Sequence, residues 1–149
     1  MRPDYDITAT DLRADLLVGE DDPDDRFLIV HALKRIRPQL SVVTVCDGIQ
    51  LIEYIQQRRS GTLPRLVLLD LNMPRMDGRE VLIRLHADPA LCNIPVVVMT
   101  TSVEPEDRSR AQALNATGFI SKPDEFARMV EVLRVLLDEQ LGPVPKGEI

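Results

Sequence analysis

Short apolar runs alternate along the chain with segments whose apolar residues recur every three or four positions. The runs have the length of strands and occupy residues 16–19, 42–46, 66–69, 94–99 and 118–121. A run that is apolar on both faces is typical of a strand in a parallel sheet covered on both sides. The pattern therefore predicts five buried strands.

Helical spacing follows each of these runs. The first helix is predicted to begin at Asp22-Pro23, where Asp suits the cap and Pro the first turn, and to stop at Pro38. Its buried face is predicted to comprise Phe27, Val30, Leu33 and Ile36. Further helices are predicted around residues 51–55, after Asp77-Gly78, from Pro105 toward Leu114 with Asn115 at its end, and over residues 124–141 before Gly142-Pro143.

Five strands that alternate with five helices predict a doubly wound α/β sandwich, in which a parallel sheet lies between two layers of helices. A chain of 149 residues has room for one substantial core. We assign residues 1–14 to a polar N-terminal arm, residues 15–141 to a single domain and residues 142–149 to a short C-terminal tail.

Composition narrows the functional classes. A chain that is 44% hydrophobic and 28% charged is typical of a folded globular protein. The net charge of −6 disfavours binding to nucleic acid or to an anionic membrane surface. The sequence has no apolar run long enough to span a membrane and no start typical of a signal peptide, so we expect a cytoplasmic protein. Cys46 and Cys92 lack the spacing of a metal or redox site, and we expect reduced thiols.

Acidic residues follow two of the predicted strands. Glu20 and Asp21 come directly after the first strand, and Asp70 comes directly after the third. The carboxyl ends of these strands can lie side by side at the switch point of a doubly wound sheet. Close carboxylates repel each other unless a hard cation such as Mg²⁺ binds between them. The sequence therefore favours a magnesium site over the simpler alternative that the acidic pair only caps the next helix.

A hydroxyl and an ammonium group complete this edge of the sheet. Thr100 follows the fourth strand and Lys122 follows the fifth. Either residue alone would most often be a cap or a solvated side chain. Together with Asp70 and the acidic pair, they can hydrogen-bond and neutralise the oxygens of a phosphoryl group. The set fits phosphoryl transfer onto Asp70 as the nucleophile.

At these positions the chain resembles the response-regulator receiver domains of two-component signalling, which share a flavodoxin-like (CheY-like) fold, across nearly its full length. The phrase Leu68-Leu69-Asp70-Leu71-Asn72-Met73-Pro74-Arg75-Met76-Asp77-Gly78 carries the resemblance, with the acidic pair before it and Thr100 and Lys122 after it. The resemblance implies that Asp70 is the phosphoacceptor and that Mg²⁺, or Mn²⁺ in its place, is bound by Glu20, Asp21, Asp70 and the backbone carbonyl of Asn72. It further implies that Thr100 is the switch hydroxyl, that Lys122 contacts the phosphate before a proline that the family usually holds in cis, and that Phe119 is the switch aromatic. The alternative for Phe119 is plain core packing.

The resemblance implies a sensor histidine kinase as the phosphoryl donor. The phrases at residues 20–25 and 94–102 look most like those of single-domain regulators paired with bacterial and cyanobacterial phytochromes, which implies a bacteriophytochrome kinase. With no effector domain in the sequence, output is expected through protein contacts, either as a switch that docks on a target or as a relay that passes the phosphoryl group to a histidine phosphotransfer protein. Such regulators often form homodimers, and an apolar stripe in the last helix suits either a dimer or packing on the sheet: Phe126, Met129, Val130, Leu133, Leu136 and Leu137.

A hydrolase of the haloacid dehalogenase type is the rival from another class. Such an enzyme also places an Asp at a strand end, but it needs a second Asp two residues later as a general acid. That position is Asn72, which cannot donate a proton in this way. We therefore expect a phosphoacceptor rather than an enzyme, with activity limited to its own phosphorylation and slow dephosphorylation.

Overall fold

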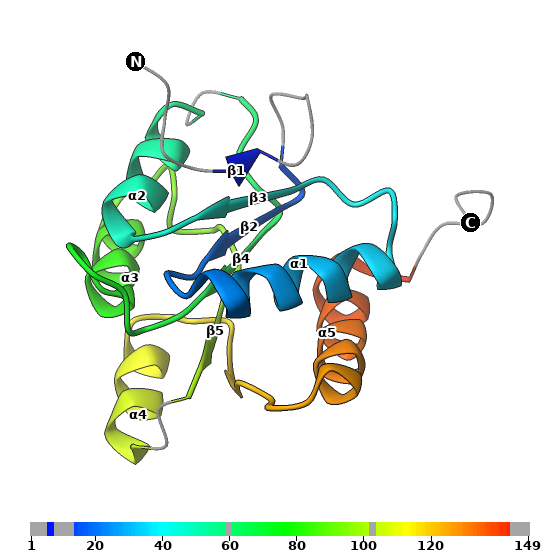
Figure 1. Ribbon diagram of the computed structural model, residues 1–149. Helices are drawn as coiled ribbons and strands as arrows, with labels where there is room; N and C mark the ends of the chain where they lie inside the picture. Colours follow the sequence, from blue (N-terminus) through cyan, green and yellow to red (C-terminus); the bar gives the residue numbers. More distant parts are fainter. Residues whose placement is uncertain (1–5, 8–13, 59–60, 102–103, 144–149) are drawn as a thin grey trace.

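A single sheet runs through the middle of the protein, with helices on both of its faces (Figure 1). The structure, a computed structural model, describes residues 6–7, 14–58, 61–101 and 104–143. The strands are β1 (Asp6–Ile7), β2 (Leu16–Gly19), β3 (Val42–Val45), β4 (Leu66–Leu69), β5 (Val96–Thr100) and β6 (Gly118–Ser121). The helices are α1 (Pro23–Ile36), α2 (Gly48–Gln56), α3 (Gly78–Ala87), α4 (Pro105–Ala113) and α5 (Phe126–Leu141).

The strand order is β1-β3-β2-β4-β5-β6, and every pair from β3 to β6 is parallel. The chain moves to one side of β2 for β3 and to the other side for β4, which makes β2 and β4 direct neighbours. Gly19 pairs with Leu69 at the ends of these two strands. The predicted doubly wound sheet, with its first and third strands side by side, is confirmed.

The sheet also has an edge strand that the apolar pattern did not predict. Strand β1 consists of two residues, Asp6–Ile7, and pairs antiparallel with β3 inside the segment assigned to a polar arm. So short a strand has no hydrophobic period of its own and forms only because β3 presents a free edge. The prediction of a purely parallel, five-stranded sheet is therefore corrected to five parallel strands plus one antiparallel edge strand. The predicted tail lies outside the described residues after Pro143.

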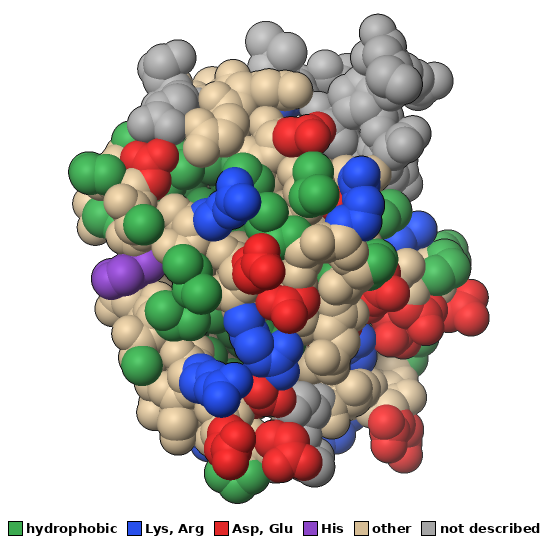
Figure 2. Space-filling model, turned by 90° about the vertical axis from the view of Figure 1, so that its left-hand side faces the viewer, with side chains coloured by type: hydrophobic (Ala, Val, Ile, Leu, Met, Phe, Trp, Pro, Cys, Tyr) green, Lys and Arg blue, Asp and Glu red, His purple; other side chains and the backbone are tan. Residues whose placement is uncertain are grey.

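Helices α1 and α5 cover one face of the sheet, and α2, α3 and α4 cover the other (Figure 1). One core cluster joins the sheet to α1 and α5, with Ile29, Leu33 and Leu133 almost fully buried. The other joins it to α2, α3 and α4, and includes Leu51 and Val81. On the side formed by α2, α3 and α4, acidic and basic side chains intermingle and form no field of one sign (Figure 2). Among the described residues, no helix is both long and apolar enough to cross a membrane.

The predicted buried face of α1 is confirmed in part, because Leu33 is buried and Val30 and Ile36 pack partly buried against the same core. Phe27 is 67% exposed, whereas Ile29, Ala32 and Leu33 are buried. A strict spacing of three residues drifts by about 60° per step around a helix of 3.6 residues per turn, so Phe27, two steps from Leu33, lies off the buried face. Phe27 instead stacks on the exposed ring of His31, with 5.8 Å between the ring centroids.

The apolar stripe of α5 packs on the sheet, as one of its two alternatives proposed. Five of its six members are buried in the cluster shared with α1, and Phe126 is half-buried. The alternative that this stripe forms a dimer surface is therefore wrong, because its side chains are already covered by other parts of the same chain. The exposed large apolar residue of this helix is Val135, at 57%.

Candidate metal and phosphoryl site

Three carboxylates meet where β2 and β4 end. One oxygen from each of Glu20, Asp21 and Asp70 lies within 4.8 Å of the others. Glu20 and Asp70 each follow a strand residue directly, and the Gly19–Leu69 pairing brings their positions together. An all-oxygen donor set suits a hard divalent cation such as Mg²⁺ or Mn²⁺.

Backbone hydrogen bonds hold the Asp70 side chain at the edge of this cluster. The Asp70 amide donates to the Gly19 carbonyl at 3.0 Å, and the Asn72 amide donates to Asp70 Oδ1 at 3.1 Å. Asp70 is 7% exposed, so its carboxylate lies at the floor of the site and not on the surface. The Asn72 side chain is exposed, and the bend after Asp70 keeps its backbone next to the cluster.

Lys122 reaches the same point from the end of β6. Its Nζ lies 2.6 Å from Glu20 Oε1, 3.1 Å from Asp25 Oδ2 and 3.2 Å from Asp70 Oδ2. Its amide donates to the Thr100 carbonyl at 2.8 Å, which fastens the start of its loop to β5. The Lys122–Pro123 bond is trans, unlike the cis bond that the resemblance implies. Lys122 is thus a cation in direct contact with the carboxylates of Glu20 and Asp70.

Burial and neighbouring charges shift the pKa values of Glu20 and Lys122. Burial raises the pKa of Glu20 to about 7; the hydrogen bond from Lys122 opposes this rise and the negative charge of Asp70 adds to it. Burial favours the neutral form of Lys122, but the hydrogen bond and charge of Glu20, with Asp70 and Asp25, outweigh it and raise the pKa of Lys122. The lysine is therefore a permanent cation, while Glu20 changes its charge near neutral pH.

Thr100 and Phe119 lie on β5 and β6, the two strands that follow β4 in the order of the sheet. Thr100 is fully buried at the end of β5 and pairs with Ser121. Phe119 is half-buried on β6, and the Arg108 guanidinium lies 5.3 Å from the centre of its ring. Arg108 also donates to the Phe119 carbonyl at 3.4 Å, across the gap to α4. Thr100 thus belongs to the same strand edge as the carboxylates, whereas Phe119 lies between the sheet and α4.

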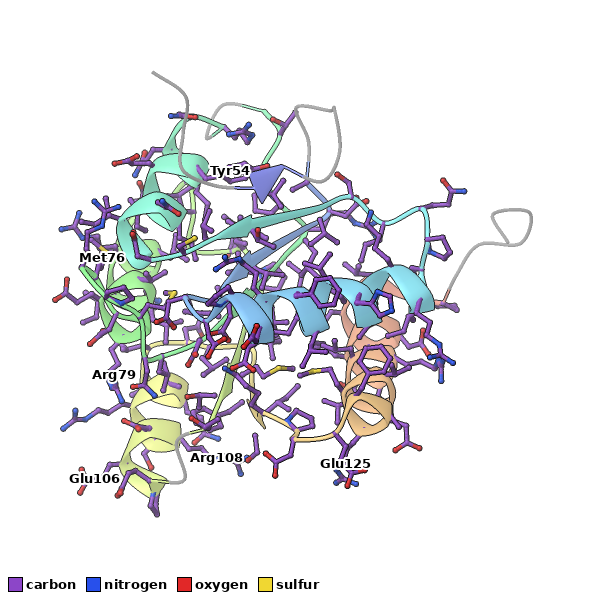
Figure 3. The ribbon with its side chains drawn as sticks, in the orientation of Figure 1. Tyr54, Met76, Arg79, Glu106, Arg108 and Glu125 are labelled. Atoms are coloured by element: carbon purple, nitrogen blue, oxygen red, sulfur yellow. The ribbon has the colours of Figure 1, made fainter. Side chains whose placement is uncertain are left out.

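The loop between β4 and α3 is fastened to α2 by an ion pair and a close backbone contact. Arg75, in the left-handed region at φ 64°, places its Nε and Nη2 each 2.8 Å from Asp47 Oδ2. The Gly48 amide donates to the Met76 carbonyl, and a Cβ on Gly48 would lie 2.1 Å from that oxygen. On the other side, Arg79 at the start of α3 donates to Asp107 Oδ1 of α4. Figure 3 shows Arg79 at the end of α3 that lies next to α4. These contacts hold the loop that carries Asn72.

The structure adds two residues to the site that the sequence pattern did not indicate. Asp25, in the first turn of α1, contacts Lys122, and Arg26 Nη1 donates to the carbonyls of Glu20 and Asp21 at 3.0 and 3.3 Å. Asp25 lies in the first turn of α1, three residues after the cap that the sequence predicts at Asp22, and this position at the helix start is the sequence feature that could have indicated it.

Comparison with known proteins decides the family. A model of the response regulator receiver domain matches residues 16–134. The chain belongs to this family. Receiver domains are phosphoacceptor signalling domains of two-component response regulators and bind a divalent metal, and the acidic cluster of this receiver domain has the donors for one. Membership and the predicted fold class are confirmed together.

The receiver domain is similar to several stand-alone regulators. It is 33% identical to the probable methanogenesis regulatory protein FilR2 of Methanothrix harundinacea over 129 residues. These residues are 85% of this chain and 83% of that protein. It is 34% identical over 110 residues to response regulator Rcp1 of Synechocystis, covering 72% and 75%. The structure of the phosphorylated cyanobacterial phytochrome response regulator RcpA matches with a TM-score of 0.81 at 32% identity, covering 89% and 97% of the two chains. The Mn²⁺-bound form of Rcp1 matches with a TM-score of 0.77 at 30% identity, covering 87% and 96%.

Proposed function

We propose that this receiver domain accepts a phosphoryl group on Asp70 and signals through the change in its protein contacts. The observation that carries the proposal is the position of Asp70, a buried carboxylate within 4.8 Å of an acidic pair and 3.2 Å from the Lys122 ammonium. A carboxylate oxygen of Asp70 attacks phosphorus, and the bond from phosphorus to the donor breaks, leaving its electron pair on the donor atom. From a histidine kinase, that atom is an imidazole nitrogen.

The residues of the site have distinct roles in this proposal. Glu20, Asp21, Asp70 and the backbone carbonyl of Asn72 hold Mg²⁺, which supplies positive charge for the phosphoryl oxygens when bound. Thr100 donates a hydrogen bond to one phosphoryl oxygen, and Lys122 neutralises another. Phe119 turns inward as Thr100 moves, which changes the surface between β6, α4 and α5. Mn²⁺ can take the place of Mg²⁺, and the Mn²⁺-bound form of Rcp1 supports this choice.

A sensor histidine kinase is the proposed donor, and a bacteriophytochrome is the proposed kind of kinase. Support comes from the similarity to RcpA, which is described as a phytochrome response regulator. The chain is about equally similar to FilR2, a probable methanogenesis regulatory protein. The pairing with a phytochrome kinase is therefore tested directly. Phosphorylated bacteriophytochrome kinase should transfer its label to this chain within seconds to minutes. A kinase that keeps its label would contradict the pairing but not the phosphoacceptor role of Asp70.

Output is proposed through a protein target in the cytoplasm, with no nucleic acid or membrane partner. The relay alternative is tested by mixing the phosphorylated chain with histidine phosphotransfer proteins, since rapid loss of label to a partner histidine would favour a relay.

Homodimerisation is also proposed, through the exposed side of α5 around Val135, where Ile120 and Val132 line a groove of about 610 Å³. Sedimentation of Val135→Glu against the unchanged chain tests this surface.

The decisive experiment is phosphorylation by acetyl phosphate, followed by intact mass, with and without Mg²⁺. We expect one added phosphoryl group in the presence of Mg²⁺ and none on Asp70→Asn. Equal labelling of Asp70→Asn would overturn the assignment of the phosphoacceptor. Small phosphoesters test the hydrolase alternative, and we expect no turnover, because Asn72 takes the place of the general acid.

A further inference from the structure

Lys122 has a third carboxylate partner that lies outside the metal cluster. The three N–H donors of its ammonium face three carboxylates, those of Glu20, Asp70 and Asp25, at distances of 2.6, 3.2 and 3.1 Å. Asp25 is not among the three carboxylates that lie close enough to share a cation. Its charge is therefore directed at the lysine and not at the metal.

The donors of Lys122 are fully used before any phosphoryl group arrives. A phosphoryl oxygen that binds this ammonium must displace one of the three carboxylates, because an ammonium has no fourth donor. The Glu20 and Asp70 side chains are 2% and 8% exposed, so neither has water to replace a lost hydrogen bond. The Asp25 side chain is 36% exposed and can be solvated when it leaves. Asp25 is thus the partner that costs least to displace.

We propose that Asp25 is a positioning residue that competes with the phosphoryl group for Lys122. It holds the ammonium in place while Asp70 is unmodified and yields it when a phosphoryl group occupies the site. The competition weakens the affinity of the site for its phosphoryl donor, whose phosphoryl oxygens meet Lys122 while Asp70 is still a carboxylate. This inference rests on the proposed phosphoryl acceptance by Asp70 and adds to it a residue that sets how tightly the phosphoryl group is held.

The chain offers a matched control one residue away. Asp24 lies in the same turn of α1, loses the same charge on substitution by Asn and is exposed, but it is not a partner of Lys122. The comparison of Asp25→Asn with Asp24→Asn therefore separates the contact from the general loss of negative charge near the site. Asp25→Glu restores the carboxylate and serves as the conservative variant.

The test measures phosphorylation of the full chain by acetyl phosphate at saturating Mg²⁺, with intact mass as the readout. In this reaction an Asp70 oxygen bonds to phosphorus, the phosphorus–oxygen bond to the acetyl group breaks, and acetate leaves with the electron pair. We expect Asp25→Asn to lower the half-saturating acetyl phosphate concentration about fivefold, with little change in the maximal rate. Asp24→Asn should change it less than about twofold, and Asp25→Glu should return it toward the unchanged chain.

Two results would overturn the inference: equal shifts in Asp25→Asn and Asp24→Asn, or a higher half-saturating concentration in Asp25→Asn. Beryllofluoride binding, followed by fluorine NMR at the same Mg²⁺ concentration, should rank the variants in the same order. Asp70→Asn is included in both assays. If it is labelled like the unchanged chain, the proposed function has failed; if it stays unlabelled while Asp25→Asn behaves like Asp24→Asn, only the role of Asp25 has failed.

Discussion

Glu20 is the residue whose charge depends most on its surroundings. It is 1% exposed, and both of its carboxylate oxygens have partners: Lys122 contacts one, and the Asp22 amide donates to the other at 3.2 Å. These contacts favour the ionised form, but burial outweighs them and raises the pKa to about 7. A carboxylate with this pKa gives the metal-free site a proton that a divalent cation must displace.

The raised pKa predicts a pH dependence of stability in the metal-free protein. The folded chain binds the Glu20 proton more tightly than the unfolded chain, so the stability from this proton is fully present below about pH 4.5 and is lost as pH rises through about 7. Glu20→Gln mimics the protonated form. Its free energy of unfolding relative to the unchanged chain should therefore rise between these pH values and level off above them, as measured by urea unfolding in a chelator.

An exposed glutamate supplies the control for this measurement. Glu53→Gln, in the middle of α2, should leave the difference in unfolding free energy flat across the same pH range. A flat profile for Glu20→Gln as well would show that burial does not shift this carboxyl.

At the scale of elements, the loop from β4 to α3 determines where Asp70 and Asn72 lie. The Gly78 amide donates to the Leu71 carbonyl at 2.9 Å, which closes the loop on itself. A Cβ on Gly78 would lie 2.6 Å from the Asp70 carbonyl oxygen and 2.8 Å from the Leu71 Cα, and both are backbone atoms that cannot rotate away. The start of α3 is therefore packed directly against the backbone of the phosphoacceptor residue.

Gly78→Ala should push the loop away from the site. We expect the free energy of unfolding to fall by about 2 kcal/mol and the affinity for Mn²⁺ to fall with it, because the added methyl overpacks rigid backbone. Thermal unfolding and Mn²⁺ titration measure the two effects. Gly61→Ala is the matched control, since nothing lies within 4 Å of a Cβ there, and it should change stability by less than about 0.5 kcal/mol. Equal effects of both substitutions would contradict the packing argument.

At the scale of the whole molecule, the order of the strands brings the charges together. Lys122 is 102 residues from Glu20 and 52 from Asp70 in the chain, yet all three side chains meet because β2, β4, β5 and β6 are successive parallel neighbours. The ammonium is the compensating charge for these buried carboxylates in the metal-free protein. The fold therefore depends on Lys122 most when no divalent cation is present.

Lys122→Met should destabilise the metal-free protein by about 3 kcal/mol, because it leaves buried carboxylates without their cation. Saturating Mg²⁺ should recover more stability in this variant than in the unchanged chain, since the metal replaces part of the lost charge. Thermal unfolding in chelator and in Mg²⁺ measures both. Lys34→Met, whose ammonium donates to the Leu40 carbonyl, should show no such difference in recovery. Equal recovery in both variants would contradict the role of Lys122 as the compensating cation.

Local pattern alone determined the five parallel strands, most helix ends and the order of the chemical groups along the chain. Residues 16–19, 66–69 and 118–121 match β2, β4 and β6, and Asn115 has the positive φ predicted for a helix end. These features depend on neighbours a few residues away, through hydrophobic period, caps and backbone preference. Glu20 and Asp70 could be assigned to strand ends in the same way, because each directly follows a short apolar run.

Only the tertiary structure decided which groups touch and how deeply they are buried. The third partner of Lys122, the exposure of Phe27 and the pairing of β1 with β3 all depend on contacts between distant parts of the chain. So does the raised pKa of Glu20, because desolvation requires walls supplied by other strands. Distances across a sheet follow from strand order and register, which no local pattern contains.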